Sequence, residues 1–185
     1  MSNTKMMLIG LLMLAGIVMG ITSCAFYRYD ANGNYSIYIK RDDFRPDVVE
    51  YYTQDITFFK RFPSPSIYMK LYYHKDRLNP ELNFYYAVID YTGGGITQFN
   101  KMSFMSGDKI AEVRNNPGNT SFHYSGGETW YSTSCFIVPD EIIKQISPEH
   151  VNKIRISDDF HYDKLLSDEN VKMIQQFVNY IESLD

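Results

Sequence analysis

The sequence predicts an α+β fold, made mostly of an antiparallel β-sheet with a C-terminal amphipathic helix packed on it. Aromatic residues make up 16% of the chain and 16 residues are tyrosines, a composition that suits the half-buried surface of a sheet. Short alternating segments are separated by closely spaced glycine and proline turns. This spacing favours an antiparallel meander, because parallel pairs need long crossovers. The last segment repeats its apolar residues with a helical period instead.

The chain begins with a segment that is typical of a secretory signal. After Lys5, residues 6–21 are almost wholly apolar. This run of about 16 residues is shorter than the roughly 20 that cross the hydrocarbon core as a helix. A basic start followed by a short apolar run and small residues is the pattern of a signal peptide. An uncleaved membrane anchor is the alternative interpretation.

The end of this leader resembles the bacterial lipobox. Ile21-Thr22-Ser23-Cys24 supplies an aliphatic residue, two small residues and the cysteine. The resemblance implies cleavage before Cys24, a diacylglyceryl group on its thiol and, usually, acylation of the new N-terminus. Because one acyl chain gives only marginal membrane binding, two or three chains make the attachment stable. Residue 25 is alanine rather than an acidic residue, which in Gram-negative lipoproteins favours the outer membrane, facing the periplasm.

These features divide the chain into a signal peptide over residues 1–23, a tether over 24–35 and one globular domain over 36–185. Residues 25–35 are polar and rich in turn formers, so they predict a short tether or a first hairpin. Without the leader, 17 basic residues face 22 acidic ones, a net charge of −5. This balance argues against a general electrostatic affinity for nucleic acid. Lipidation of Cys24 would also leave Cys135 without an intramolecular disulfide partner.

Strands are expected wherever apolar and polar residues alternate between turns. They cover residues 36–40, 56–61, 66–74, 82–91, 96–105, 110–114, 121–124, 129–138 and 151–157. Residues 46–52 begin at a proline and predict one or two helical turns. Residues 140–146 predict a short helix that ends before Pro148. The final helix is expected from about Asp168 to Leu184, with Ser167 as its N-cap.

Tyrosines on the strand faces form the candidate binding surface, namely Tyr68, Tyr72 and Tyr85. Tyrosine is amphipathic, loses little side-chain entropy on binding and is common in binding surfaces. A row of exposed rings could therefore hold a sugar, a peptide or a partner sheet. The alternative is that cross-strand tyrosine pairs stabilise the sheet without binding anything.

The sequence carries no catalytic or metal-binding signature. Cys135 and His123 could form a thiol–imidazole pair, but Cys135 lies within an expected strand, where cysteine is ordinarily a small hydrophobic residue. The acidic pairs Asp42-Asp43 and Asp158-Asp159 are flanked by basic residues and are expected in charged loops. No metal-ligand spacing joins the four histidines, which are His74, His123, His150 and His161. We therefore expect no catalytic residue, no metal site and no cofactor.

The stretch from Tyr124 to Tyr180 is similar in pattern to the C-terminal part of uncharacterised bacterial secreted and lipoprotein domains. Its parts are a glycine turn, a strand, a short helix led by Pro-Asp-Glu, a strand and a helix opened by Leu-Ser-Asp-Glu. This similarity covers less than a third of the chain and implies no activity. The expected function is a non-enzymatic, membrane-tethered binding or accessory domain with an envelope protein or a glycan as partner. The alternatives are a lipid-anchored hydrolase and an inhibitor or immunity-type protein.

Overall fold

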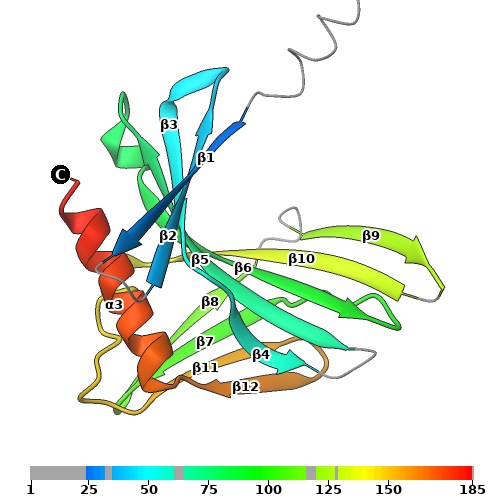
Figure 1. The fold of residues 1–185 in the computed structure, drawn as a ribbon. Coiled ribbons are helices and arrows are strands. Elements are labelled where there is room, and N and C mark those ends of the chain that lie inside the picture. The colour runs from blue at the N-terminus through cyan, green and yellow to red at the C-terminus, as the bar shows by residue number, and fades with distance from the viewer. Residues whose placement is uncertain (1–23, 32–34, 61–64, 116–119, 128, 185) are drawn as a thin grey trace, which may run out of the picture.

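A computed structural model describes residues 24–31, 35–60, 65–115, 120–127 and 129–184 (Figure 1). Antiparallel strands make up most of the fold, together with one short helix and one C-terminal helix, as the sequence predicts. The expected signal peptide, including Ile21, Thr22 and Ser23, lies outside the described residues.

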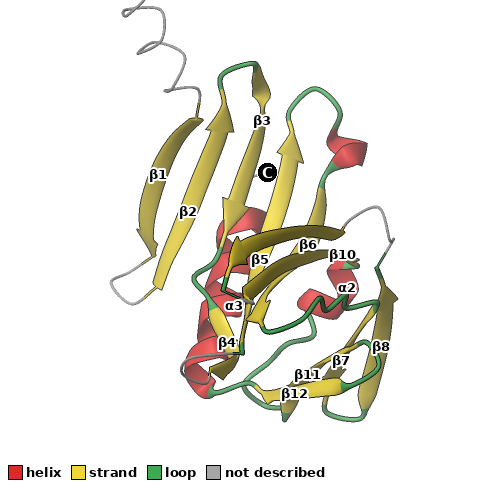
Figure 2. Cartoon of the chain, turned by 90° about the vertical axis from the view of Figure 1, so that its right-hand side faces the viewer, coloured by secondary structure: helices red, strands yellow, loops and turns green. Residues whose placement is uncertain are grey.

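The strands form two sheets, in which every pairing is antiparallel. The large sheet contains β1 (Cys24–Ala31), β2 (Tyr35–Asp42), β3 (Arg45–Tyr52), β4 (Ile56–Lys60), β5 (Ser66–Asp76), β6 (Phe84–Gly93), β9 (Thr120–Gly126) and β10 (Thr129–Val138). The small sheet contains β7 (Lys101–Ser106), β8 (Lys109–Arg114), β11 (Asn152–Ser157) and β12 (His161–Leu165). Figure 2 shows the small sheet facing one end of the large sheet.

The strand order departs from a simple meander. The large sheet has the order β1-β2-β3-β5-β6-β10-β9, with β4 paired to β5 outside this path, and the small sheet has the order β12-β11-β7-β8. The chain therefore leaves the large sheet after β6, builds a hairpin of the small sheet, returns as β9 and β10, and leaves again for β11 and β12. Two segments far apart in the sequence, β7 and β11, become neighbours in this way.

The C-terminal helix α3 (Asp168–Glu182) begins where the sequence predicts. The side chain of Ser167 accepts a hydrogen bond from the backbone N–H of Asn170 at 3.3 Å. Asp168 and Glu169 lie in the first turn, where a negative charge interacts favourably with the helix dipole. Its buried side chains are Val171, Met173, Ile174, Phe177, Val178 and Ile181.

One hydrophobic core joins the inner faces of both sheets and α3. The ring of Phe177 lies edge-on to Tyr85 of β6, with 6.2 Å between centroids. Between the sheets, Phe99 makes edge contacts with Tyr91 at 6.2 Å and with Tyr162 at 5.9 Å. The helix α2 (Asp140–Ile143) is shorter than expected, and it buries Ile143 in this core. A single 3₁₀ turn, η1 (Pro80–Leu82), precedes β6.

The helical turns predicted for residues 46–52 are wrong, because these residues belong to β3. Within this strand Val49 and Tyr51 are buried while Glu50 and Tyr52 occupy the other face. Pro46 is accommodated because it falls in the irregular part of the β2–β3 pairing and before the first β5 partner, Val48↔Asp76. A strand tolerates proline where no partner needs its missing N–H.

Three further segments differ from expectation. Residues 96–100 are a loop, and β7 begins only at Lys101, although Phe99 within that loop is fully buried. The strand β12 was not expected from its charged sequence. Of the two alternatives for residues 25–35, a tether or a first hairpin, the structure has β1 paired with β2 over Cys24–Ala31.

Candidate functional site

The three tyrosines of the predicted binding surface do not share a face. Tyr68 and Tyr72 lie half-buried on the outer face of the large sheet, away from the core. Tyr85 points to the opposite face, is 1% exposed and packs against Tyr73 and Phe177. The expectation of an exposed Tyr85 is therefore wrong. In a strand with consecutive aromatic residues, alternation alone does not say which residue faces the core.

Tyr86, not Tyr85, joins Tyr72 in a row that we call the tyrosine ladder. It runs across β2, β3, β5 and β6 and consists of Tyr38, Tyr52, Tyr72 and Tyr86, which are direct cross-strand partners. Successive ring centroids are 5.1, 5.0 and 4.8 Å apart, with interplanar angles of 16°, 22° and 18°. Rings that are stacked in this way cover one another's faces. The geometry therefore favours cross-strand stabilisation over a row of free rings for a ligand.

A hydrogen bond and an ion pair, both made by Glu50, link the tyrosine ladder to the charged side chains next to it. The hydroxyl of Tyr86 donates to Oε1 of Glu50 at 2.8 Å, and Lys40 Nζ lies 3.2 Å from Oε2 of the same carboxylate. Burial, reinforced by the charge and hydrogen bond of Glu50, raises the pKa of Tyr86 far above its ordinary value. Burial also raises the pKa of Tyr72. Both hydroxyls therefore remain protonated hydrogen-bond donors at neutral pH.

Cys135 and His123 do not form a thiol–imidazole pair. Cys135 is half-buried on the outer face of β10, opposite Val88. His123 on β9 lies opposite Tyr131, four strand positions away from Cys135, which corresponds to about 13 Å. Burial, and then the charge of Glu50, raises the pKa of the Cys135 thiol, so its nucleophilic thiolate form is disfavoured.

The structure does not gather the four histidines and the two acidic pairs into one site, although His161 and the pair Asp158-Asp159 line one groove, which is described below. His74 stacks on Phe84 with 5.1 Å between ring centroids. Asp158 caps its own turn, because its Oδ1 accepts the backbone N–H of Phe160 at 2.7 Å. Among the described residues, no group of three or more His, Cys, Asp or Glu side chains could hold a metal ion.

The sequence did not predict a groove of about 900 Å³ on the outer face of the small sheet. We call it the small-sheet groove. It lies on a sheet face that is formed by three cross-strand rows, each running from β12 through β11 and β7 to β8. The rows are Leu165–Lys153–Met105–Ile110, Asp163–Arg155–Ser103–Glu112 and His161–Ser157–Lys101–Arg114.

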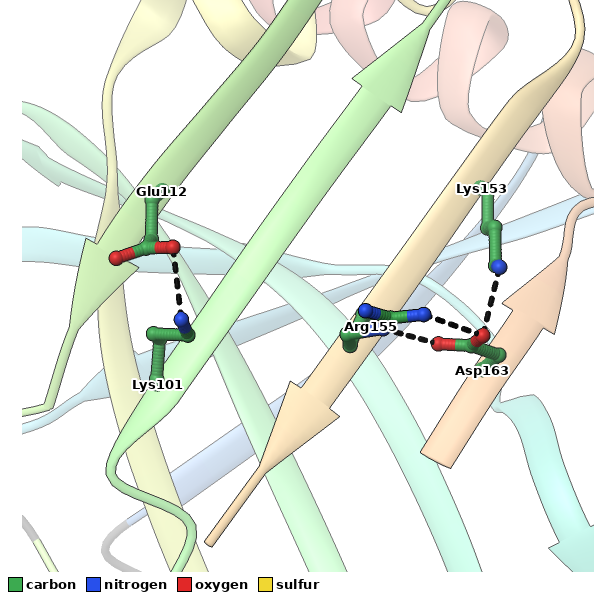
Figure 3. Close-up of polar contacts among 5 residues, drawn as sticks. All are labelled: Lys101, Glu112, Lys153, Arg155 and Asp163. Atoms are coloured by element: carbon green, nitrogen blue, oxygen red, sulfur yellow. Dashed lines mark hydrogen bonds and ion pairs between the residues drawn. The ribbon is translucent and has the colours of Figure 1, made fainter. Parts of the chain in front are cut away.

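Ion pairs draw the long side chains of the groove towards its two edges (Figure 3). Arg155 binds Asp163 on β12 with both Nε and a terminal nitrogen, at 2.6 and 2.9 Å. Lys153 reaches the same carboxylate at 2.6 Å. On the other side, Lys101 Nζ lies 2.9 Å from Oε2 of Glu112 on β8.

The floor between these two walls contains two short side chains as well as Met105. Ser103 of β7 and Ser157 of β11 both line the groove and contribute only a hydroxyl each. One end of the groove carries Ile110, which is 71% exposed, and the turn after β11 carries Phe160, which is 73% exposed. The groove thus combines a polar floor and charged walls with an apolar group at each end.

The charges along the strands of the groove are unequal. Four basic side chains line the groove, Lys101, Arg114, Lys153 and Arg155, and on the strands they meet two carboxylates, Glu112 in the lining and Asp163 on β12 beside it. Hydrogen bonds from Arg155, and then from Lys153, hold the pKa of Asp163 well below its usual range. Arg114 makes no ion pair with any residue that the structure describes. Asp158 and Asp159 add negative charge at the β11–β12 turn only.

The sequence pattern indicated only part of this groove. The alternation in residues 151–157 does place Lys153 and Arg155 on one face, away from Ile154 and Ile156. However, the pairing of these cations with Asp163 needs β12, and their nearness to Lys101 needs β7 beside β11. Both relationships are tertiary.

In the described part of the chain, no helix is long and apolar enough to cross a membrane. No family model matches this chain, and it matches no curated protein and no solved structure.

Proposed function

We propose that this protein is a lipid-anchored binding domain of the cell envelope and that the small-sheet groove holds its ligand. The observation that carries the proposal is the groove itself, with a volume of about 900 Å³ on a paired, four-stranded sheet. This volume lies in the range of pockets that bind small ligands, about 300 to 1,000 Å³. A sheet with paired strands also holds its side chains in place before a ligand arrives, which reduces the entropy lost on binding.

Binding is favoured over hydrolysis by the geometry of the polar groups. Ser157 and His161 face each other across β11 and β12, which is the one pairing in the groove that suggests a nucleophile and a base. No hydrogen bond joins them, and no described carboxylate accepts a hydrogen bond from His161. A serine nucleophile needs an adjacent base that a third group orients. The groove contains a serine and a histidine, but no described group orients the histidine.

The position of the proposed anchor is compatible with a ligand site on the small sheet. Cys24 is the first residue of β1, an edge strand of the large sheet. Figures 1 and 2 both place that end of β1 on the side of the molecule far from the small sheet. Lipid chains on Cys24 would therefore hold the groove away from the membrane surface.

The anchor is tested by a pair of cysteine variants in a bacterial host with lipoprotein processing. We expect Cys24→Ala to block cleavage of the leader and incorporation of labelled palmitate. Cys135→Ala is the matched control, because it removes the other cysteine and should leave both steps intact. A Cys24→Ala chain that is still processed at the same position and still labelled would refute the lipoprotein assignment.

The ligand site is tested by filling the groove. Ser103→Trp places a large ring on the floor between the ion-paired walls, whereas Ser121→Trp places the same ring on exposed β9. The purified chains, in detergent, are immobilised and exposed to glycan and protein fractions of the cell envelope. We expect Ser103→Trp to lose retained material, while Ser121→Trp keeps it. Equal retention by both variants, with unchanged melting temperatures, would contradict a ligand site in the groove.

A further inference from the structure

We propose that the small-sheet groove binds an acidic glycan, an oligosaccharide that carries carboxylate groups. This inference rests on the proposed function, since it names the ligand of the same groove. It combines three properties of the groove, which are an arginine without a described ion-pair partner, hydroxyl groups on its floor and an exposed aromatic ring at its rim.

The arginine on β8 that has no described ion-pair partner calls for a ligand with negative charge. Over the whole groove four basic side chains are balanced by four carboxylates, Glu112, Asp158, Asp159 and Asp163. Three of the cations are held in ion pairs, Lys101 with Glu112 and both Lys153 and Arg155 with Asp163. Arg114 lies at the end of β8 beside Lys101, its cross-strand partner, and binds no described carboxylate. A guanidinium is well suited to a carboxylate because it donates two parallel hydrogen bonds. We therefore place a sugar carboxylate near Arg114.

The rest of the groove suits a sugar. Ser103 and Ser157 each offer a hydroxyl that can donate and accept. The carboxylates of Glu112 and Asp163 keep lone pairs that can accept further hydrogen bonds from sugar hydroxyls. The exposed ring of Phe160 can cover the apolar face of a pyranose. From β8 to β12 the face spans three strand spacings, about 14 Å, which is enough for a short oligosaccharide.

Charge also orients the ligand across the groove. Asp158 and Asp159 lie at the turn between β11 and β12, on the Phe160 side. They repel a carboxylate at that position, whereas Arg114 and Lys101 attract one on the opposite side. The acidic end of the glycan therefore lies over β7 and β8, and a neutral ring lies towards Phe160.

Two other polymers fit the groove less well. An extended peptide is recognised mainly through main-chain hydrogen bonds at a sheet edge, but the groove lies on a sheet face whose strands β7 and β11 are paired on both sides. Single-stranded nucleic acid needs a basic channel with several stacking rings. The groove has one strongly exposed ring, Phe160, and two rim aspartates.

The test compares two forms of one sugar polymer, oligogalacturonate and its methyl ester, which differ only in the charge of the carboxyl groups. The purified chain in detergent is titrated with each by calorimetry at low salt. We expect the acidic form to bind at least about tenfold more tightly than the ester, since charge-assisted hydrogen bonds are lost in the ester. Binding of the acidic form should weaken as salt is raised.

Arg114→Gln should weaken oligogalacturonate binding about tenfold, whereas Arg77→Gln should leave the affinity unchanged. Arg77 is an exposed arginine outside the groove and serves as the matched control. Melting temperatures of both variants establish that each chain is folded.

Equal affinity for the acid and the ester, or no binding of either, would overturn the acidic-glycan inference. The envelope-retention experiment then separates the two proposals. If Ser103→Trp still abolishes retention, the groove is a ligand site for another chemical class. If Ser103→Trp has no effect either, the proposed function fails together with the inference.

Discussion

The hydroxyl of Tyr86 on β6 donates a 2.8 Å hydrogen bond to Oε1 of Glu50 on β3, reaching across β5, which lies between these strands. The bond ties the tyrosine ladder to the charged row of Lys40 and Glu50 beside it. We expect Glu50→Ala to lower the free energy of unfolding by about 1 to 3 kcal/mol, because a half-buried donor loses its partner. Urea denaturation measures this change.

Glu50→Gln is the matched variant, since its amide oxygen can still accept from Tyr86, and it should cost less than Glu50→Ala. A double-mutant cycle with Tyr86→Phe isolates the pair. Strictly additive effects of Glu50→Ala and Tyr86→Phe would show that this hydrogen bond contributes nothing to stability.

The ladder also predicts how stability changes at high pH. Burial raises the folded-state pKa of Tyr72 and Tyr86 above the unfolded value of about 10. Their contribution is fully present below pH of about 10 and is lost as the pH rises towards the folded pKa, because the unfolded chain releases these protons first. We expect the free energy of unfolding to fall above pH of about 10.

Tyr86→Phe should make this alkaline decline shallower, because one raised pKa is removed. Tyr124→Phe is the control, since Tyr124 is 51% exposed and lies on β9, away from the tyrosine ladder. If the two variants change the alkaline slope equally, Tyr86 does not carry the effect.

The ion pairs at the groove predict that the free energy of unfolding also falls at low pH. Hydrogen bonds from Arg155 and Lys153 lower the folded-state pKa of Asp163 below the unfolded value of about 3.9. Its contribution is present above that unfolded value and is lost as the pH falls through the lowered folded pKa. Asp163→Asn should therefore flatten the acid limb of the stability curve, measured by chemical denaturation between neutral and acidic pH.

Asp159→Asn is the control for this measurement, because Asp159 is an exposed aspartate at the turn next to β12. An unchanged acid limb in Asp163→Asn would show that the ion pairs at the groove wall do not contribute to stability.

Two neighbouring glycines at the end of β6 should respond differently to alanine. A Cβ on Gly93 would collide with the ring and hydroxyl of Tyr91, which is 8% exposed and packs on Phe99. Because that ring has little room to move, Gly93→Ala should destabilise the protein by about 1 to 3 kcal/mol. Gly95→Ala meets nothing within 4 Å and should be close to neutral. Equal melting temperatures for the two variants would contradict the packing around Tyr91.

Local patterns were sufficient for most strands. Alternating burial is visible along β5 and β6, and these are the segments whose sequence alternation is clearest. Ser167 and the acidic first turn likewise marked the start of α3. The pattern failed for β3, where Pro46 suggested the start of a helix. A strand can hold Pro46 because this residue has no cross-strand partner in the sheet. It also failed for β12, whose charged sequence shows no apolar stripe, although its Tyr162 packs on Phe99 of the core and its Asp163 forms ion pairs on the outer face.

The candidate binding residues were likewise predicted in part from local pattern and decided in part by tertiary contacts. Alternation placed Tyr85 and its neighbour Tyr86 on opposite faces of β6, but both are aromatic. The contact of Tyr85 with Phe177, more than 90 residues later in the sequence, decided which ring is buried. Sequence reasoning therefore named two tyrosines of the outer face, Tyr68 and Tyr72, and missed Tyr86, which completes the row with Tyr72.

The sequence by itself determined the residue types, the strand-forming alternation and the cap of the last helix, because these depend on neighbours a few positions away. It also contains the Ile21–Cys24 motif on which the proposed anchor rests. Only the tertiary structure decided that β7 lies beside β11, and so that Ser103 meets Arg155 on one surface. Strand order depends on which apolar faces bury one another across the whole chain. The groove exists only after that choice is made.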